Sequence, residues 1–514
     1  MNRAPLIGAI AASAALLAVR LYAAGHLGFG DAEALYASYA WHPQPVYVDH
    51  PGLIGLVARI VGGGSPPSPR AAHLVTSCVA TAAPWVAALA ARAAGASPAG
   101  AALAALAMMI APEISLGLFG LTPDLLLILL WYASVGTSLW AIQARPGSLR
   151  ALGGALGSGV AAGLACDAKV SGVLLLAGLA WGWAAPQAQA HRRTIAPWAG
   201  LAVALLIFSP VVADEIARGF PMLRHRLVDT QKDAGLSLRN IGALVGGQLV
   251  YVTPPLLVAA FFVARDLHRR RDDDAVSRFL WSVTVTALPL VLLCCVSRVA
   301  EPHWVAPVYL ALPLHFATSR GARMGAERLV SARLAKSALA TGAVAIALVH
   351  AWVLLPIGPR LLGGSYVPRY DLANDLYAWK QGLPVVRQAL VESALADRPA
   401  AIVVGPHWTV CAQLHAGLPA EVQVGCEAEV SDDFARWLPS AVWGRAPIIL
   451  YVTDDRFADD VGNRRDHRVD ATWHVDVRRG GRRIRRITVT RLVASDVARS
   501  DGDDERGVDD TLLR

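Results

Sequence analysis

Long apolar runs fill the chain up to about residue 358 and restrict it to a membrane fold. Runs such as 4–25 and 72–92 are long enough to cross the roughly 30 Å hydrocarbon core of a bilayer as helices. Only 17% of the residues are charged, whereas soluble domains carry about a quarter. The sequence therefore predicts a mainly α, polytopic membrane protein, and we expect no nucleic-acid partner. Eleven spans are predicted, at about residues 4–25, 72–92, 98–117, 122–142, 150–166, 168–185, 195–213, 241–264, 279–298, 303–319 and 337–357.

Basic clusters between the spans indicate the orientation. The strongest are RDLHRRRDDD (265–274) and SRGARMGAERLVSARLAK (319–336). With the N-terminus in the cytoplasm, both clusters fall inside, as the positive-inside rule requires. An odd number of spans then places the chain after about residue 358 outside. The first run has no clear small-residue cleavage site, so we expect it to be a retained span.

The character of the sequence changes after the last apolar run. AIVVGPHWTV (401–410) and APIILYVTDD (446–455) are short strand-like runs bounded by turn residues. DLYAWKQGLPVVRQALVESAL (375–395) has a helical pattern. These features predict a transmembrane domain at 1–358, a small extracytoplasmic α/β domain at 359–497, and a charged, disordered tail at 498–514.

The six cysteines form no metal-binding pattern. Four of them lie in or near apolar runs, where cysteine packs as a small core residue. Cys411 and Cys426 are the two in the predicted outer domain. An oxidising compartment would allow them to pair, so we predict a disulfide between them.

Several ionisable residues that are unusual for a membrane protein fall on the predicted outer side. Each has a structural explanation by itself, as a solvated loop residue, a first-turn acid or an interfacial anchor. Charges near membrane depth usually face a cavity or a partner, however, and five separate segments supply these. Their convergence favours a site. The residues are Asp31 and Glu33 in GFGDAEALYASYA, Asp49 and His50 in YVDHPGLIG, Asp124 in LTPD, Asp167 and Lys169 in CDAKVSG, and Glu301 and His303 in AEPHWVAPVY.

The outer loop 214–240 is basic, against the positive-inside trend. Its acids neutralise these cations in one interpretation; in the other, the cations bind a phosphate. A carboxylate that accepts a proton from a hydroxyl, and cations that stabilise a departing phosphate, together suit glycosyl transfer from a lipid-phosphate sugar. The cations of the loop are Arg218, Arg224, Arg226, Lys232 and Arg239.

Five motifs, in this order, resemble the bacterial members of the protein-mannosyltransferase and aminoarabinose-transferase group, which are dolichyl-phosphate-mannose-protein mannosyltransferase-like membrane enzymes of the GT-C fold. The motifs are DAEALY…YVDHPGLIG, LTPDLLLILLW, CDAKVSGVLLLAG, GGQLVYVTPPLL and EPHWVAPVYLALP. The resemblance covers about residues 5–360 and extends weakly to DLYAWKQ and LYVTDDR. It implies a glycosyltransferase of the bacterial inner membrane with a polyprenyl-phosphate-linked sugar donor, an extracytoplasmic site and inversion at the anomeric carbon.

The resemblance also implies roles for single residues. The first-loop acid that acts as the family's base corresponds to Asp31, and its second acid to Glu33. The family has these two acids adjacent, whereas Ala32 separates them here, so either one is a candidate for the base. The predicted catalytic set is Asp31, Glu33 and Asp124, and the predicted donor-binding set is Asp49, His50, Lys169, Arg218, Arg224, Arg226, Glu301 and His303. No cofactor is expected, and the sequence leaves metal use open, with Asp49 and His303 as the candidate pair.

Three other functions remain as alternatives. A transporter would have paired repeats and broken midplane helices, which the sequence does not indicate. An envelope polysaccharide ligase or flippase would share the topology and the basic outer loops, but would lack the ordered TPD and EPHW motifs. A non-catalytic assembly protein would tolerate substitution of Asp31 and Glu33. The sequence specifies neither the sugar nor the acceptor, which is a hydroxyl of a lipid, a glycan or a protein.

Overall fold

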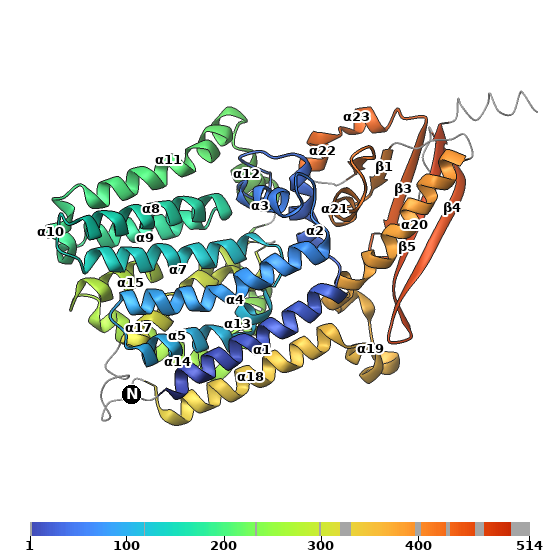
Figure 1. Cartoon of the computed structure of the whole chain (residues 1–514). Helices are drawn as coiled ribbons and strands as arrows, with labels where there is room; N and C mark the ends of the chain where they lie inside the picture. Colours follow the sequence, from blue (N-terminus) through green and yellow to red (C-terminus); the bar gives the residue numbers. More distant parts are fainter. Residues whose placement is uncertain are drawn as a thin grey trace, which may run out of the picture. The chain divides into compact units, whose positions relative to one another are not determined.

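The computed structural model describes residues 3–117, 119–231, 234–297, 300–318, 330–395, 402–427, 432–457 and 467–494. The chain forms two compact units, whose elements are labelled in Figure 1. The membrane unit consists of Met1–Gly25, Pro43–Val57 and Ala71–Ala351, and the C-terminal unit consists of His26–His42, Ala58–Arg70 and Trp352–Arg514. The predicted tail 498–514, the cation Lys232 and most of the basic segment 319–336 lie outside the described residues.

Helices make up nearly all of the membrane unit. Proline begins several of them, since its missing N–H has no helical partner in the first turn. The helices are α1 (Ala4–His26), α3 (Leu53–Val61), α4 (Pro69–Ala93), α5 (Pro98–Met109), α6 (Pro112–Gly117), α7 (Pro123–Ile142), α8 (Leu149–Ala168), α9 (Gly172–Ala184), α10 (Gln189–Arg192), α11 (Ala196–Ala217), α12 (Pro221–Arg224), α13 (Leu238–Tyr251), α14 (Pro254–Arg270), α15 (Ala275–Val285), α16 (Pro289–Val296), α17 (Leu312–Thr318) and α18 (Ala332–Leu354). The short helix α2 (Asp31–Ser38) belongs to the C-terminal unit.

Seven helices of the described chain are long and apolar enough to cross a bilayer, or up to eight if α13 and α14, which bend by 99° at their junction, form one span. Helices α5 and α9 are apolar but shorter. The predicted span 98–117 is divided into α5 and α6, and 303–319 becomes the 3-10 helix Pro302–Val308 followed by α17. Pro112 and Pro307 lie at these interruptions, because proline cannot continue an α-helical hydrogen-bond ladder. The multi-pass membrane protein is confirmed, and the number of eleven spans stays a prediction.

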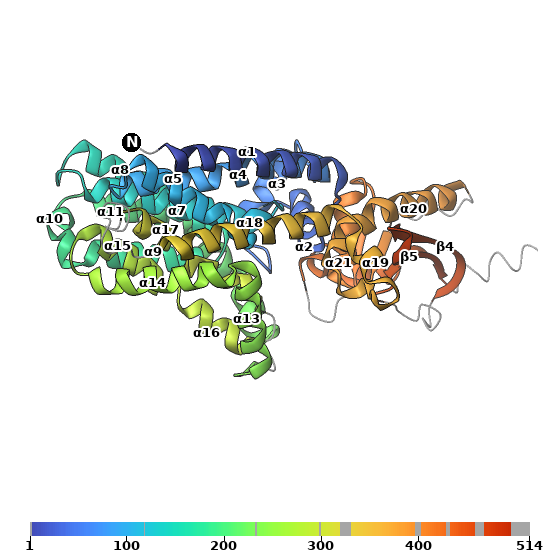
Figure 2. The same ribbon diagram turned by 90° about the horizontal axis from the view of Figure 1, so that it is seen from below.

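Small residues let the central helices approach closely. Figure 2 shows the membrane unit from a second side, with α13 and α16 next to each other. A Cβ atom on Gly159 of α8 would collide with the backbone of Gly200 in α11. The hydroxyls of Ser138 in α7 and Ser158 in α8 lie 2.7 Å apart. Close backbone contact and interhelical hydrogen bonds are what hold helices together in lipid, where water exclusion contributes little.

Within its described residues, the C-terminal unit contains one five-stranded sheet with the strand order β2-β1-β3-β5-β4. Strand β1 is parallel to β2 and β3, and β5 is antiparallel to β3 and β4. The small α/β region after the last span is thereby confirmed. Its elements are β1 (Ile402–Gly405), β2 (Gln423–Cys426), β3 (Ile448–Asp454), β4 (His467–Arg479), β5 (Arg482–Ala494), α19 (Ile357–Leu361), α20 (Asp375–Leu395), α21 (Trp408–Gly417), α22 (Asp433–Trp437) and α23 (Ser440–Trp443).

All three local predictions for this unit correspond to elements of the structure, one of them over a shorter range than predicted. The helix predicted at 375–395 is α20, and the strand predicted at 446–455 contains β3. The strand predicted at 401–410 ends at Gly405. There, the side chain of His407 accepts a hydrogen bond from Thr409 N and caps α21, which begins at the next residue. A side-chain acceptor at this position starts a helix and thus ends the extended run.

The first part of the first outer loop, His26–His42, belongs to the C-terminal unit. Its helix α2 packs on α21, and the side chain of Gln413 donates to Phe29 O over 3.0 Å. Gly28 N donates to Leu376 O over 2.7 Å. Cys411 of α21 and Cys426 of β2 form a disulfide, as predicted. Residues of the first loop are therefore positioned by elements that follow them by more than 300 residues.

Candidate active site

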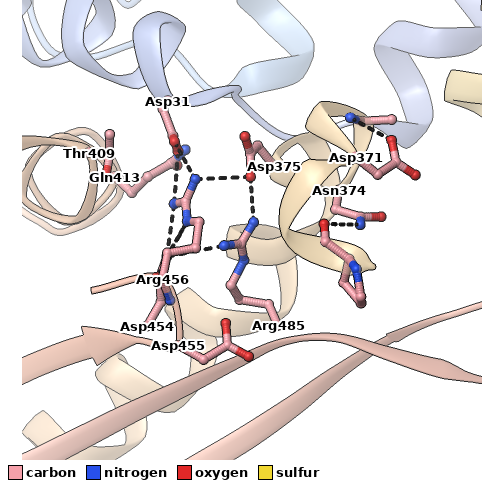
Figure 3. A network of polar contacts seen from close by, with 12 residues as sticks. Asp31, Asp371, Asn374, Asp375, Thr409, Gln413, Asp454, Asp455, Arg456 and Arg485 are labelled. Atoms are coloured by element: carbon pink, nitrogen blue, oxygen red, sulfur yellow. Dashed lines mark hydrogen bonds and ion pairs between the residues drawn. The ribbon is translucent and has the colours of Figure 1, made fainter. Parts of the chain in front are cut away.

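The first group of charged residues lies in the C-terminal unit and is called here the carboxylate group: Asp31, Asp375, Asp454, Arg456 and Arg485 (Figure 3). Asp31 is the first residue of α2, where a negative charge is favourable at the helix N-terminus. Arg456 Nη1 lies 2.7 Å from Asp31 Oδ2 and 3.1 Å from Asp375 Oδ1. Arg456 Nη2 lies 2.8 Å from Asp454 Oδ2. The predicted base is thus held by an arginine of the LYVTDDR motif.

Negative charge exceeds positive charge in the carboxylate group. Its three carboxylates meet two guanidiniums, since Arg485 also bonds to Asp375, at 2.5 Å. Burial, followed by the nearby charge of Asp31, raises the pKa of Asp375 to about 6. Burial acts to lower the pKa of Arg456, but the hydrogen bonds to Asp454 and Asp31 outweigh it and raise that pKa. Arg456 therefore stays charged, and protons enter the group at its acids.

Glu33, the second predicted acid, has a local structural role. It is buried, and its Oε2 accepts a hydrogen bond from Gly30 N over 3.0 Å, at the start of α2. A carboxylate at the third helical position that bonds back to the N-cap backbone satisfies an otherwise unpaired N–H. Asp31 and Glu33 thus differ in their partners: Arg456 pairs with Asp31, and the backbone of Gly30 bonds to Glu33.

The second group lies in the membrane unit and is called here the cation group. It consists of Lys169, Arg226 and His303. Lys169 is buried, and its Nζ lies 2.7 Å from Oδ1 of Asp124. Lys169 Nζ and Arg226 Cζ each lie 5.6 Å from the centroid of the Trp304 ring. Three segments that are distant in the sequence, therefore, bring two cations to one aromatic face, where cation–π contacts stabilise them.

Asp49 and His50 lie on a tight turn beside this group. Tyr47 N donates to His50 O over 2.8 Å, and a Cβ atom on Gly52 would lie 2.9 Å from Pro45 O, so glycine is needed there. Arg226 Nη2 lies 2.9 Å from Asp49 Oδ1 and 3.3 Å from His50 Nε2. The turn thus presents its acid and its imidazole to Arg226.

The imidazole of His50 is neutral in this setting. Burial lowers its pKa well below the ordinary value, and the charges of Arg226, Lys169 and His303 lower it further. These three residues are the members of the cation group, so His50 interacts electrostatically with all of them. Because the His50 imidazole is neutral, it does not offset the positive charge of Lys169 and Arg226. That charge suits a negatively charged ligand.

The other predicted donor-binding residues are placed as follows. Arg218 donates to Val46 O over 2.6 Å and so supports the turn. Glu301 Oε2 lies 3.2 Å from Nδ1 of His303. Arg224 is 70% exposed and pairs with Asp229 at 3.5 Å. The structure therefore brings Asp49, His50, Asp124, Lys169, Arg226 and His303 into one neighbourhood, with Arg218 behind the turn and Arg224 toward solvent.

An apolar cavity of about 250 Å³ also lies in the membrane unit. Residues of α5, α6, α7, α14, α17 and α18 line it, almost all with hydrocarbon side chains. Its few polar groups come from Glu113, Tyr132 and Tyr309. Glu113 interacts electrostatically with Asp124 and Lys169, so this acid connects the cavity with the cation group.

Sequence reasoning did not identify Glu113, His225, Asp375, Asp454, Arg456 and Arg485 as site residues. His225 precedes Arg226, and its Nε2 lies 3.8 Å from Asp49 Oδ1. The family-like motifs DLYAWKQ and LYVTDDR contain Asp375, Asp454 and Arg456, and could have indicated these three. In the part of the chain that the structure describes, three or more His, Cys, Asp or Glu side chains nowhere gather as a metal site would require.

Comparisons with known proteins support the predicted resemblance. A family model described as dolichyl-phosphate-mannose-protein mannosyltransferase matches residues 50–213. The structure of ArnT from Cupriavidus metallidurans bound to undecaprenyl phosphate is similar with a TM-score of 0.57 and 17% identity, over 95% of this chain and 98% of that one. The apo structure of the same protein has a TM-score of 0.60 and 16% identity, over 94% and 97% of the two chains. No curated protein matches the sequence.

The chain has a GT-C fold. At these identities the structural likeness extends to the fold alone. The residues matched by the family model include His50, Asp124 and Lys169, so the matched range overlaps the cation group. The resemblance read from the five motifs is confirmed at this level, and the roles of single residues remain predictions.

Proposed function

We propose that this protein is a membrane glycosyltransferase that moves a sugar from a polyprenyl-phosphate donor to an acceptor hydroxyl, with inversion at the anomeric carbon. The observation that carries the proposal is the cation group: Lys169 and Arg226 meet at Trp304 in the membrane unit of a GT-C fold. Two cations at this place suit a phosphate that remains attached to a lipid. The apolar cavity beside Glu113 suits hydrocarbon of the prenyl chain.

In the proposed reaction, Asp31 accepts the proton of the acceptor hydroxyl. The hydroxyl oxygen then forms a bond to the anomeric carbon, and the bond from that carbon to the phosphate oxygen breaks. The electron pair of the broken bond leaves with polyprenyl phosphate, whose new charge Lys169 and Arg226 stabilise. The capping contact of Glu33 supports Asp31 as the base, since Glu33 is engaged with the backbone of Gly30. The mechanism uses no cofactor.

Asp124 takes a positioning role in this proposal. Its contact with Lys169 at 2.7 Å fixes the ammonium group next to Trp304. Asp49 fixes Arg226 in the same way, at 2.9 Å. Each cation thus has one carboxylate partner that orients it before the phosphate binds, which reduces the reorganisation that binding requires.

We place the protein in a bacterial inner membrane with its N-terminus in the cytoplasm and the C-terminal unit outside. The disulfide Cys411–Cys426 supports this side, because disulfides persist in oxidising compartments. The donor is a hexose or a pentose on polyprenyl phosphate, and the acceptor is a lipid, a glycan or a protein of the envelope.

Mass spectrometry of envelope lipids, glycans and proteins from a deletion strain tests the proposal. We expect one sugar modification to disappear and to return with the wild-type gene, while a gene carrying Asp31→Asn does not restore it. Unchanged modifications in the deletion strain would refute a transferase of this kind. Restoration by the Asp31→Asn gene would instead favour a structural role for the protein.

A further inference from the structure

The chain that leaves the last spanning helix carries several exposed apolar side chains. Helix α18 has 23 residues and ends at Leu354, and the short helix α19 follows at once. Leu361 is 74% exposed and Tyr370 is 80% exposed. An exposed apolar surface on a protein marks an interaction site with a protein or a membrane. Its members are Leu355, Leu361, Leu362, Val367, Tyr370 and Leu372.

The turn of the β4–β5 hairpin is fixed to the same segment. Arg479, at the end of β4, donates to the backbone oxygens of Trp352 and Val353 over 2.6 and 2.7 Å. A Cβ atom on Gly480 would lie 2.8 Å from Pro356 Cβ, so the turn packs directly against the chain after α18 (Figure 1). A helix of this length spans a bilayer. The hairpin turn is fixed to the chain segment that follows α18.

The arginines of this hairpin fall into two classes. The buried ones have acid partners: Arg479 with Asp371 at 3.4 Å, and Arg485 with Asp375 at 2.5 Å. Five exposed arginines lie at the turn and on the segment after α18. Asp371 is buried and bonded to Tyr366, so it does not offset their charge at the surface. The exposed cations are Arg360, Arg369, Arg478, Arg482 and Arg483.

Three of these exposed arginines have no carboxylate partner within the described ranges: Arg360, Arg369 and Arg482. Asp476, the nearest acid on β4, pairs with Arg486 at 2.6 Å and lies 3.9 Å from Arg483. The surface thus combines exposed leucine and tyrosine side chains with an excess of positive charge. This combination is typical of segments that lie in the headgroup region of a membrane.

We propose that this surface, the interfacial surface, docks onto the bilayer and binds anionic phospholipid headgroups. The apolar side chains enter the boundary between headgroups and acyl chains, and the arginines bind lipid phosphates. Each arginine near an anionic membrane contributes about fivefold in affinity, equivalent to about 1 kcal/mol. The bound lipid holds the interfacial surface at the membrane. The proposal does not depend on the glycosyltransferase reaction.

Hydrogen–deuterium exchange of the full-length protein in nanodiscs tests the proposal. Nanodiscs of phosphatidylcholine alone are compared with nanodiscs that also contain phosphatidylglycerol. We expect residues 357–372 and the hairpin turn to exchange more slowly in the anionic nanodiscs. The variant R482Q/R483Q should lose about fivefold of this protection for each arginine, and should match the wild type in pure phosphatidylcholine.

A matched control is available at the other end of the same hairpin. Arg468 and Arg445 are exposed, and Arg468 lies about 12 residues from the turn, or roughly 40 Å along an extended strand. R445Q/R468Q removes the same charge and should keep the full protection. Substituting Leu361→Ser and Tyr370→Ser together should increase exchange in both kinds of nanodisc, because the apolar contact does not depend on lipid charge.

Three results would overturn the proposal. The first is equal exchange in neutral and anionic nanodiscs. The second is an equal loss of protection in R445Q/R468Q, which would make the effect one of net charge. The third is protection by soluble polyphosphate but not by phosphatidylglycerol, which would assign the arginines to a soluble polyanion.

Discussion

The carboxylate group and the cation group differ in how their positive and negative charges are balanced. In the cation group, Lys169 pairs with Asp124, and Arg226 with Asp49, so each cation has one carboxylate. In the carboxylate group, the three acids outnumber the two arginines. Unbalanced negative charge suits proton uptake, and oriented cations suit a phosphate. The two groups therefore correspond to the two halves of the proposed reaction, and substitutions should affect them differently.

The largest effect is expected for the base. Asp31→Asn removes the proton acceptor and should lower turnover by about 10²–10⁴-fold, the usual contribution of general-base catalysis. Glu33→Gln should have a smaller effect on turnover, unless Glu33 and not Asp31 corresponds to the family's base. The measurement is the rate of sugar transfer by purified variants. Asp455→Asn is the control, since Asp455 is exposed and bonds to Arg486 N. Near-wild-type rates for both Asp31→Asn and Glu33→Gln would mean that the base lies elsewhere.

The next largest effect concerns the leaving phosphate. Lys169→Met should lower turnover by about 10²–10³-fold, as the loss of one oriented charge donor does in other enzymes. The apparent KM for the lipid donor should rise as well, because the ground-state phosphate also loses a cation. Arg224→Met, which removes an exposed arginine, serves as the control for net charge. Steady-state kinetics with both variants identical to the wild type would remove Lys169 from the site.

Arg456 connects the predicted base to the sheet, so its loss should affect both stability and turnover. Arg456→Gln leaves acids of the carboxylate group without this partner and should destabilise the C-terminal unit by about 3–5 kcal/mol, as when one partner of a buried pair is removed. Thermal unfolding measures this effect, with Arg445→Gln as the exposed control. If Arg456 acts through Asp31, then Asp31→Asn should add little further loss of turnover in the Arg456→Gln background. Fully additive losses would separate the two residues.

The smallest of these effects is expected for the disulfide. Cys411 and Cys426 are 15 residues apart, and a loop of that size contributes about 3 kcal/mol in the chain-entropy model. The variant with both cysteines replaced by serine should therefore unfold at a lower temperature, with turnover retained below that temperature. Free thiols at both positions in the native, unreduced protein would contradict the bond itself.

Local patterns were sufficient to predict some of this structure. Apolar length predicted the spans, and helical periodicity predicted α20 over 375–395. The β4–β5 hairpin was missed although its signal is present: Gly480 and Gly481 have φ values of 60° and 83°, as two-residue hairpin turns require. Consecutive arginines around this turn interrupt the alternation of apolar and polar residues that indicates a strand.

The sequence predicted less of the candidate site than of the secondary structure. Single motifs indicated Asp31, Asp124 and Lys169, because acids and lysines beside apolar runs are rare. The bond between Asp31 and Arg456 joins residues 425 positions apart, and no local pattern specifies such a contact. It arises from the packing of α2 on α21 and from the turn after β3, which only the folded chain defines.

Equilibrium binding of polyprenyl phosphate tests the separation of the two groups most directly. It is measured for the wild type, Asp31→Asn and Lys169→Met, each in the same nanodiscs. We predict that Lys169→Met weakens binding by about 10- to 100-fold, the effect of losing a charged hydrogen bond worth about 1.5–3 kcal/mol, and that Asp31→Asn binds like the wild type. Equal weakening in both variants, or in neither, would contradict the assignment of the phosphate to the cation group and the proton to the carboxylate group.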